Sequence, residues 1–177
     1  QRYQDLLPQV EMVILSGSKA PGFSPQLFPW MTACAGKLGK TVLLDIRGPD
    51  LLACLEQRPD LIKPNRCEFI ETFFPGLSQP DEERISEQML QIAQLGTQVI
   101  LTDGKLPVLA TLDSKVQAFP VFPMDPVNTI GSGDAFAAGM ASAWLQTKNL
   151  SSAIEKGIWC ARQNAMCLRP GVLRDGP

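Results

Sequence analysis

Apolar runs and amphipathic stretches alternate along most of this chain. Four short apolar runs are typical of buried strands: residues 11–15, 41–45, 60–63 and 98–102. Between or beside them lie stretches with the spacing of helices: residues 24–38, 50–55, 66–74 and 81–95. Strands that alternate with helices in this way predict an α/β fold built on a mostly parallel sheet.

The last third of the chain has a different pattern. Residues 107–112 and 115–122 flank the dipeptide Asp113-Ser114, which predicts a hairpin. Two helices are expected to follow. The first runs from the turn Gly-Ser-Gly-Asp to about Thr147, and the second runs from a capping box at Ser152 and Glu155 to about Leu168. Because no repeat or clear linker interrupts the pattern, we expect residues 1–177 to form a single α/β domain.

Composition narrows the class of protein. The chain has 177 residues, 45% of them hydrophobic and 19% charged, with a net charge of −2, which is typical of a soluble globular domain. It shows no basic stripe and no apolar run of membrane-spanning length, so we expect neither nucleic acid nor a membrane as a partner. Histidine is absent, which excludes Ser-His-Asp catalysis and histidine ligation of a metal within this chain. Five cysteines without a Cys-x-x-Cys pair indicate reduced thiols and a cytoplasmic location.

The most informative segment is residues 128–134, Asn-Thr-Ile-Gly-Ser-Gly-Asp, which an apolar helical run follows at once. The first N–H groups of a helix have no partner within it, and together with the helix dipole they bind anions. An aspartate beside a bound phosphate is useful if it takes the proton from a nucleophile that attacks the phosphate. The segment therefore indicates phosphoryl transfer with Asp134 as the base. An ordinary turn followed by a helix cap is the alternative interpretation.

Polar residues also follow the predicted parallel strands, where open α/β sheets bind their ligands. They are Ser16 and Gly17, Asp45, Lys63, Asn65 and Glu68, and Thr102 and Gly104. Each has a structural alternative. We interpret Lys63 as a solvated charge at the rim, and Asn65 with Glu68 has the spacing of a helix cap, which is compatible with a ligand role. Asn164, in the apolar last helix, either bonds a neighbouring backbone group or lines a nucleotide pocket.

These pieces resemble motifs of the ribokinase-like (PfkB) family of sugar kinases. Residues 128–134 resemble the family's Asp/Asn-Thr-x-Gly-Ala-Gly-Asp signature, and residues 65–68 resemble its Asn-x-x-Glu motif. Residues 16–18 with Pro21 and Gly22 are similar to the Ser-Gly-Ser stretch of the phosphofructokinase branch. Asparagine at position 128 points to the members that act on sugar phosphates, which include 1-phosphofructokinase and tagatose-6-phosphate kinase. The chain departs from the pattern at Pro107, where the family has a glycine.

The resemblance implies a three-layer, Rossmann-like fold with helices flanking the sheet, and it implies roles for individual residues. Asp134 would be the catalytic base, and the amides of Gly131, Ser132 and Gly133 would form an anion hole. ATP would be bound by Asn65, Thr102, Gly104, Asn128 and Asn164, the sugar by Ser16 and Gly17, and Mg²⁺ by Glu68. The family's N-terminal part and its β lid have no counterpart here, and the chain begins with Gln1, so we expect the catalytic part of a longer kinase.

By this resemblance the function is ATP-dependent phosphorylation of a sugar or sugar phosphate, of the fructose 1-phosphate, fructose 6-phosphate or tagatose 6-phosphate class. A homodimer is left open. Two other functions are weighed against it. A nucleotide-binding module without catalysis is suggested by Pro107 and by the missing N-terminal part. A dinucleotide-dependent oxidoreductase would need Gly-x-Gly-x-x-Gly after the first strand, and that loop has only Gly17 between two serines.

Overall fold

A computed structural model describes residues 2–173 of the chain. The chain divides into two compact units, one that extends to Ala118 and one that begins at Phe119. The expectation of a single domain over residues 1–177 stays a prediction.

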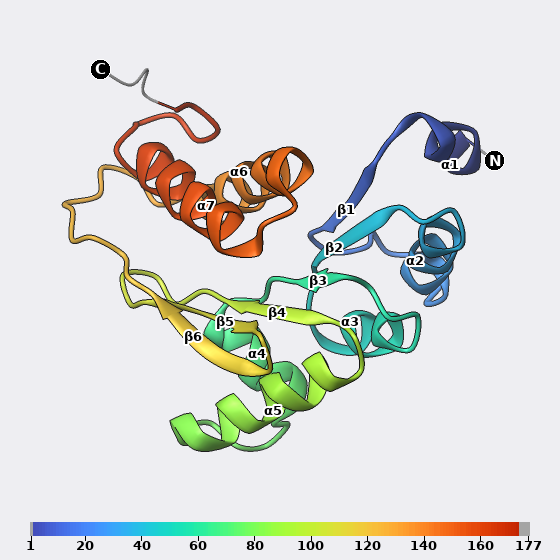
Figure 1. Ribbon diagram of the computed structural model, residues 1–177, viewed down its shortest axis with the longest axis horizontal. Coiled ribbons are helices and arrows are strands. Elements are labelled where there is room, and N and C mark those ends of the chain that lie inside the picture. Colours follow the sequence, from blue (N-terminus) through green and yellow to red (C-terminus); the bar gives the residue numbers. More distant parts are fainter. Residues whose placement is uncertain (1, 174–177) are drawn as a thin grey trace. The chain divides into compact units, whose positions relative to one another are not determined.

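The described residues contain one six-stranded sheet with strands in chain order (Figure 1). Its strands are β1 (Met12–Ser16), β2 (Thr41–Asp45), β3 (Leu61–Ile62), β4 (Gln98–Leu101), β5 (Val108–Leu112) and β6 (Lys115–Phe119). Strands β1 to β4 run parallel, and β5 is antiparallel to β4. The predicted mostly parallel α/β sheet is therefore confirmed. Asp113 and Ser114 both have positive φ, at 47° and 61°, which suits the two-residue hairpin turn expected there.

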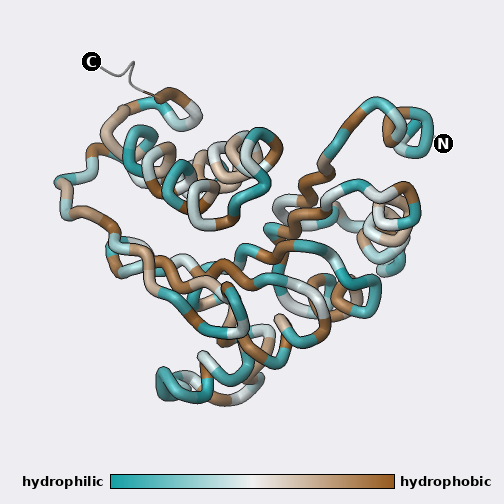
Figure 2. Tube along the Cα trace, in the orientation of Figure 1, coloured by the Kyte–Doolittle hydropathy of each residue, from teal (hydrophilic) through white to brown (hydrophobic). Residues whose placement is uncertain are grey.

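Helices connect the parallel strands and cover one face of the sheet. They are α2 (Leu27–Lys37), α3 (Gly48–Leu55), α4 (Arg66–Phe73) and α5 (Glu82–Gln94), preceded by α1 (Arg2–Leu6) and a 3₁₀ turn over Leu7–Gln9. Their apolar side chains and alternate strand residues share one buried core, which includes Leu51, Phe69, Met89, Leu44 and Val99. Strand residues of the other face, such as Leu43 and Ile100, are buried as well. This double burial explains why β2 and β4 are hydrophobic over most of their length (Figure 2).

The second unit is built on α6 (Ser132–Thr147) and α7 (Leu150–Ala165). Two glycines let these helices approach closely, because a Cβ at Gly139 would lie 2.5 Å from Cys160 Sγ and a Cβ at Gly157 would lie 3.0 Å from Phe136. Within residues 2–173, no helix is long and apolar enough to cross a lipid bilayer.

Two helix starts differ from the sequence expectation. Helix α7 begins after Asn149, whose Oδ1 accepts from the Ser152 N–H, so the expected capping box at Ser152 and Glu155 is wrong. Asn149 supplies a side-chain acceptor three residues earlier, and the helix starts there. Helix α2 begins at Leu27 rather than at residue 24, because Ser24 Oγ closes a local turn by accepting from the Gln26 N–H.

The single tyrosine of the chain provides a test of the packing of α1. Tyr3 Oη donates to Met31 O at 2.7 Å, and burial, with a smaller contribution from Cys34, raises the pKa of Tyr3 to about 12. The neutral phenol is thus favoured in the folded chain, so its contribution to stability is complete below pH 10 and disappears as the pH rises through 12. We expect the tyrosinate absorbance at 295 nm to titrate near pH 12. A midpoint near the ordinary value of 10 would show that Tyr3 is not packed as described.

Candidate functional site

The carboxyl ends of the parallel strands form the first group of candidate residues. Ser16 ends β1 beside Asp45, which ends β2. The Gly17 N–H donates to Asp45 O at 3.0 Å, and Gly17 has a φ of +84°, which a residue with a side chain rarely adopts. The two residues expected to bind the sugar are therefore held in a tight turn against the end of the neighbouring strand.

Lys63 lies at the same edge of the sheet, and it is not a rim charge. It is only 3% exposed, and its Nζ lies 3.0 Å from Asp45 Oδ1. The interpretation of Lys63 as solvated is therefore wrong. The parallel register that pairs Leu44 with Ile62 places the next residues, Asp45 and Lys63, side by side at the strand ends. Burial of the ammonium group is tolerated because the carboxylate compensates its charge.

Asn65 and Glu68 form the predicted helix cap at the start of α4. Asn65 Oδ1 accepts from the Glu68 N–H at 3.0 Å, and Glu68 Oε2 accepts from the Asn65 N–H at 2.9 Å. The cap uses only one carboxylate oxygen of Glu68, and a metal could use the other. In the part of the chain that the structure describes, no cluster of three or more His, Cys, Asp or Glu side chains could hold a metal.

The loop after β4 is joined to this cap by backbone hydrogen bonds. Asn65 and Thr102 form an isolated parallel bridge, the Arg66 N–H donates to Thr102 O at 2.8 Å, and the Thr102 N–H donates to Pro64 O at 3.2 Å. Gly104 turns the loop with a φ of +55°. The structure therefore brings together three of the residues expected to bind ATP, namely Asn65, Thr102 and Gly104.

The second unit carries the Gly-Ser-Gly-Asp turn. Gly131 has a φ of +77° and precedes the first residue of the 16-residue helix α6, in which Asp134 is the third. The Asn128 side chain shapes this turn, because its Oδ1 accepts from the Ile130 N–H at 3.0 Å and its Nδ2 donates to Leu168 O at 2.9 Å. The turn thus places the amino end of a long helix beside an exposed carboxylate, as expected for an anion site with an adjacent base.

The Asn164 side chain stabilises this turn through hydrogen bonds. It is fully buried on α7; its Nδ2 donates to Ile130 O at 2.9 Å and to Ser132 Oγ at 3.1 Å, and its Oδ1 accepts from the Gly171 N–H at 2.7 Å. Of the two roles considered for Asn164, the structure shows the bond to a neighbouring backbone group. A direct contact with the nucleotide stays a prediction.

We expect Asn164→Leu to lower the free energy of unfolding by about 3 kcal/mol, because it removes the three partly buried hydrogen bonds of the Asn164 amide. Urea denaturation measures the loss. Gln163→Leu is the matched control, since Gln163 precedes Asn164 on α7 and is only partly buried. Equal stability of the two variants would show that the Asn164 hydrogen bonds contribute little.

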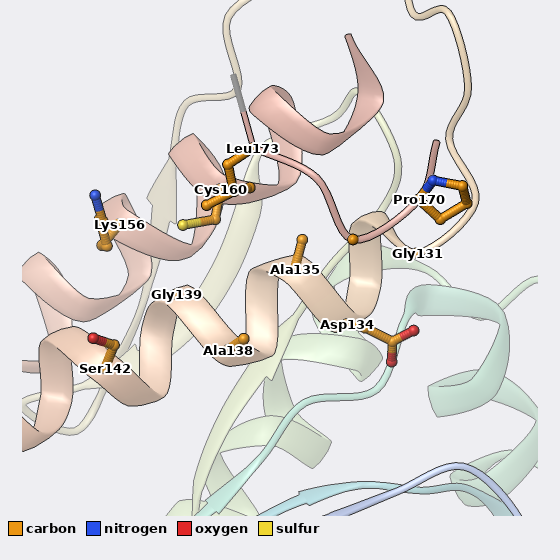
Figure 3. Close-up of a pocket in the computed structure, with 11 residues that line it drawn as sticks. Gly131, Asp134, Ala135, Ala138, Gly139, Ser142, Lys156, Cys160, Pro170 and Leu173 are labelled. Carbon is orange, nitrogen blue, oxygen red and sulfur yellow. The ribbon is translucent and has the colours of Figure 1, made fainter. Parts of the chain in front are cut away.

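A cavity of about 620 Å³ opens beside this turn (Figure 3). Gly131 and Asp134 lie at one end of it, and the small side chains of Ala135 and Ala138 leave room along α6. Cys160 of α7 also lines the cavity. Burial raises the pKa of its thiol, an effect that Lys156 partly offsets, so Cys160 is a neutral thiol and a poor nucleophile.

Sequence reasoning missed one ionic cluster in the first unit. Arg66 pairs with Asp103 at 2.6 Å and with Glu82 at 2.8 Å. These partners are 37 and 16 residues away along the chain, so no local spacing reveals them. The sequence shows only that opposite charges lie at the starts of α4 and α5 and shortly after β4.

Comparisons with known proteins show the family and the fold of the chain. The family model "pfkB family carbohydrate kinase" matches residues 1–171. The chain is 32% identical over 141 residues to "1-phosphofructokinase" of Rhodobacter capsulatus, an alignment that covers 78% of the chain and 44% of that protein. Its fold is similar to phosphofructokinase-2 from Escherichia coli, with a TM-score of 0.80 at 21% identity over 93% of the chain and 54% of that structure. Ribokinase of Arabidopsis thaliana gives a TM-score of 0.77 at 20% identity over 94% of the chain and 53% of that structure.

The chain spans about half the length of these relatives. Nearly all of its own length falls within the family match, and that match contains both groups of candidate residues. The chain therefore belongs to the pfkB family of carbohydrate kinases, in its 1-phosphofructokinase branch.

Proposed function

We propose that the protein is an ATP-dependent kinase that phosphorylates a hydroxyl group of a sugar phosphate, of the fructose 1-phosphate, fructose 6-phosphate or tagatose 6-phosphate class. The observation that carries the proposal is the turn over residues 131–134, which sets an exposed aspartate in the first turn of a 16-residue helix. Family membership supports it, as does the similarity to a 1-phosphofructokinase. The chemistry of the turn fits phosphoryl transfer, in which catalysis consists mainly of positioning and charge stabilisation.

In this proposal Asp134 is the catalytic base. It takes the proton of the attacking hydroxyl group as the new O–P bond forms and the bond from the γ-phosphorus to the bridging oxygen breaks, releasing ADP. Asp134 lies in the first turn of α6, where a carboxylate interacts favourably with the helix dipole.

The backbone of the turn stabilises the charge that develops on the transferred phosphoryl group. The amides of Gly131, Ser132 and Gly133 form the proposed anion hole. The Ser132 N–H donates to Thr129 O at 3.2 Å, so Ser132 has to exchange this long bond for one to the phosphoryl oxygen. Asn128 and Asn164 hold the turn in shape before the anion arrives.

Residues of the first unit are proposed to bind the rest of the nucleotide and the sugar. Thr102 and Gly104 lie near the ATP phosphates, Asn65 contacts them, and Ser16 and Gly17 bind the sugar. The Glu68 oxygen that the helix cap does not use would hold Mg²⁺, directly or through water. Bound Mg²⁺ neutralises part of the phosphate charge.

The five free thiols fit a reducing compartment, so we place the protein in the cytoplasm.

The proposal is tested by measuring ADP release from Mg-ATP by the intact protein with fructose 1-phosphate, fructose 6-phosphate and tagatose 6-phosphate in turn. We expect at least one of them to be phosphorylated with saturation kinetics. Binding of Mg-ATP by calorimetry without phosphorylation of any sugar would favour a nucleotide-binding module instead. Binding of NADH in place of ATP would favour an oxidoreductase.

A further inference from the structure

Arg66 connects three elements of the first unit through its guanidinium group. It is the first residue of α4, and its side chain is 22% exposed. Nε donates to Asp103 Oδ2 at 2.6 Å, while Nη1 and Nη2 donate to the two carboxylate oxygens of Glu82 at 2.8 and 3.1 Å. The pair with Glu82 is bidentate, a geometry that a planar guanidinium forms and a lysine cannot. Arg66 is therefore held in one orientation.

The position of Asp103 connects the ionic network of Arg66, Asp103 and Glu82 with the proposed nucleotide site. Asp103 stands between Thr102 and Gly104, in the loop proposed to lie near the ATP phosphates. A carboxylate there repels a polyphosphate unless a cation compensates its charge. Arg66 supplies that cation within hydrogen-bond distance, and its backbone N–H also binds Thr102 O. The loop is thus attached to Arg66 through both main chain and side chain.

Glu82 adds to the rigidity of this arrangement. It is the first residue of α5, and its own side chain is 70% exposed, so it holds Arg66 from the solvent side. Burial disfavours the charged form of Arg66, but Glu82 and Asp103 outweigh it, and the net effect raises the pKa of Arg66. Arg66 is therefore a cation at neutral pH.

We propose that Arg66 is a positioning residue that compensates the Asp103 carboxylate and fixes the Thr102–Gly104 loop for the binding of Mg-ATP. The inference rests on the proposed kinase function. A residue that compensates charge differs from a purely structural brace in one respect. If charge compensation matters, removing the Asp103 charge restores nucleotide binding to a protein that lacks Arg66. If Arg66 acts only as a brace, removing Asp103 as well brings no recovery.

The test measures the Kd for Mg-ATP of the intact protein by calorimetry for Arg66→Gln, Arg66→Lys and the double variant Arg66→Gln/Asp103→Asn. We expect Arg66→Gln to raise the Kd about tenfold, which is within the range of coupling energies between residues in one ionic network. The double variant is expected to recover most of the affinity, and Arg66→Lys to recover part of it. Arg84→Gln is the control, because Arg84 forms only an exposed pair with Asp81 at 3.8 Å, and its Kd should equal that of the parent.

Hydrogen exchange of the nucleotide-free protein gives a second readout, which does not depend on catalysis. We expect Arg66→Gln to speed exchange of the amides of residues 102–106 about tenfold, with no change there in Arg84→Gln. A parent that binds Mg-ATP, with an Arg66→Gln variant that binds it equally well, would overturn this inference and leave the kinase proposal intact. A double variant no better than Arg66→Gln would overturn the charge compensation. A parent that binds no Mg-ATP would overturn both proposals.

Discussion

Replacing Asp134 by asparagine is expected to lower kcat for sugar phosphorylation about 1000-fold, within the range that general-base catalysis supplies. Asparagine keeps the size of the side chain and its place in the first turn of α6, but it cannot take the proton of the attacking hydroxyl group. The Kd for Mg-ATP should change less than threefold, because the proposed anion hole is made of backbone amides. Steady-state kinetics and calorimetry on the same preparations separate the two effects.

Asp125→Asn is the matched control, since Asp125 is an exposed acid of the same unit outside the turn. Its kcat should equal that of the parent. An Asp134→Asn variant that keeps more than half of the parent activity would exclude Asp134 as the base. A variant that loses ATP affinity and activity together would instead indicate that the carboxylate supports nucleotide binding.

Replacing Lys63 by methionine is expected to destabilise the fold by about 3 kcal/mol, because it removes the cation of a buried ion pair while the carboxylate stays in place. Asp45 is 13% exposed at its side chain, so water can reach little of the remaining carboxylate. Methionine fills a similar volume, which limits any loss from packing. Urea denaturation followed by tryptophan fluorescence measures the change.

The double variant Lys63→Met/Asp45→Asn should regain at least half of this loss, because it also removes the buried carboxylate charge that Lys63 offsets. Lys105→Met, at an exposed loop position, is the control and should leave the stability unchanged. If the double variant is no more stable than Lys63→Met alone, the loss comes from packing of the lysine side chain rather than from charge.

Most of the secondary structure follows from local patterns. The apolar runs located β1, β2 and β4 to within a residue at each end, and β2 and β4 are the buried parallel strands that are hydrophobic on both faces. The hairpin turn at Asp113 and Ser114 was also identified, since short polar residues tolerate positive φ. The start of α7 was misplaced because Asn149 and Ser152 are both good helix caps. A helix capped by Ser152 would start three residues later than the helix capped by Asn149.

In the candidate site, too, contacts between neighbours in the sequence were predictable and contacts between distant residues were not. By itself the sequence determined the Asn65–Glu68 cap, whose hydrogen bonds join residues three apart, and the start of α6 after Gly131, whose positive φ suits a glycine. Only the tertiary structure showed that Lys63 is buried against Asp45, that Arg66 binds Asp103 from 37 residues away, and that Asn164 holds Ile130 from 34 residues away. Those contacts depend on strand register and helix packing, which bring together charges and amides that no spacing along the chain relates.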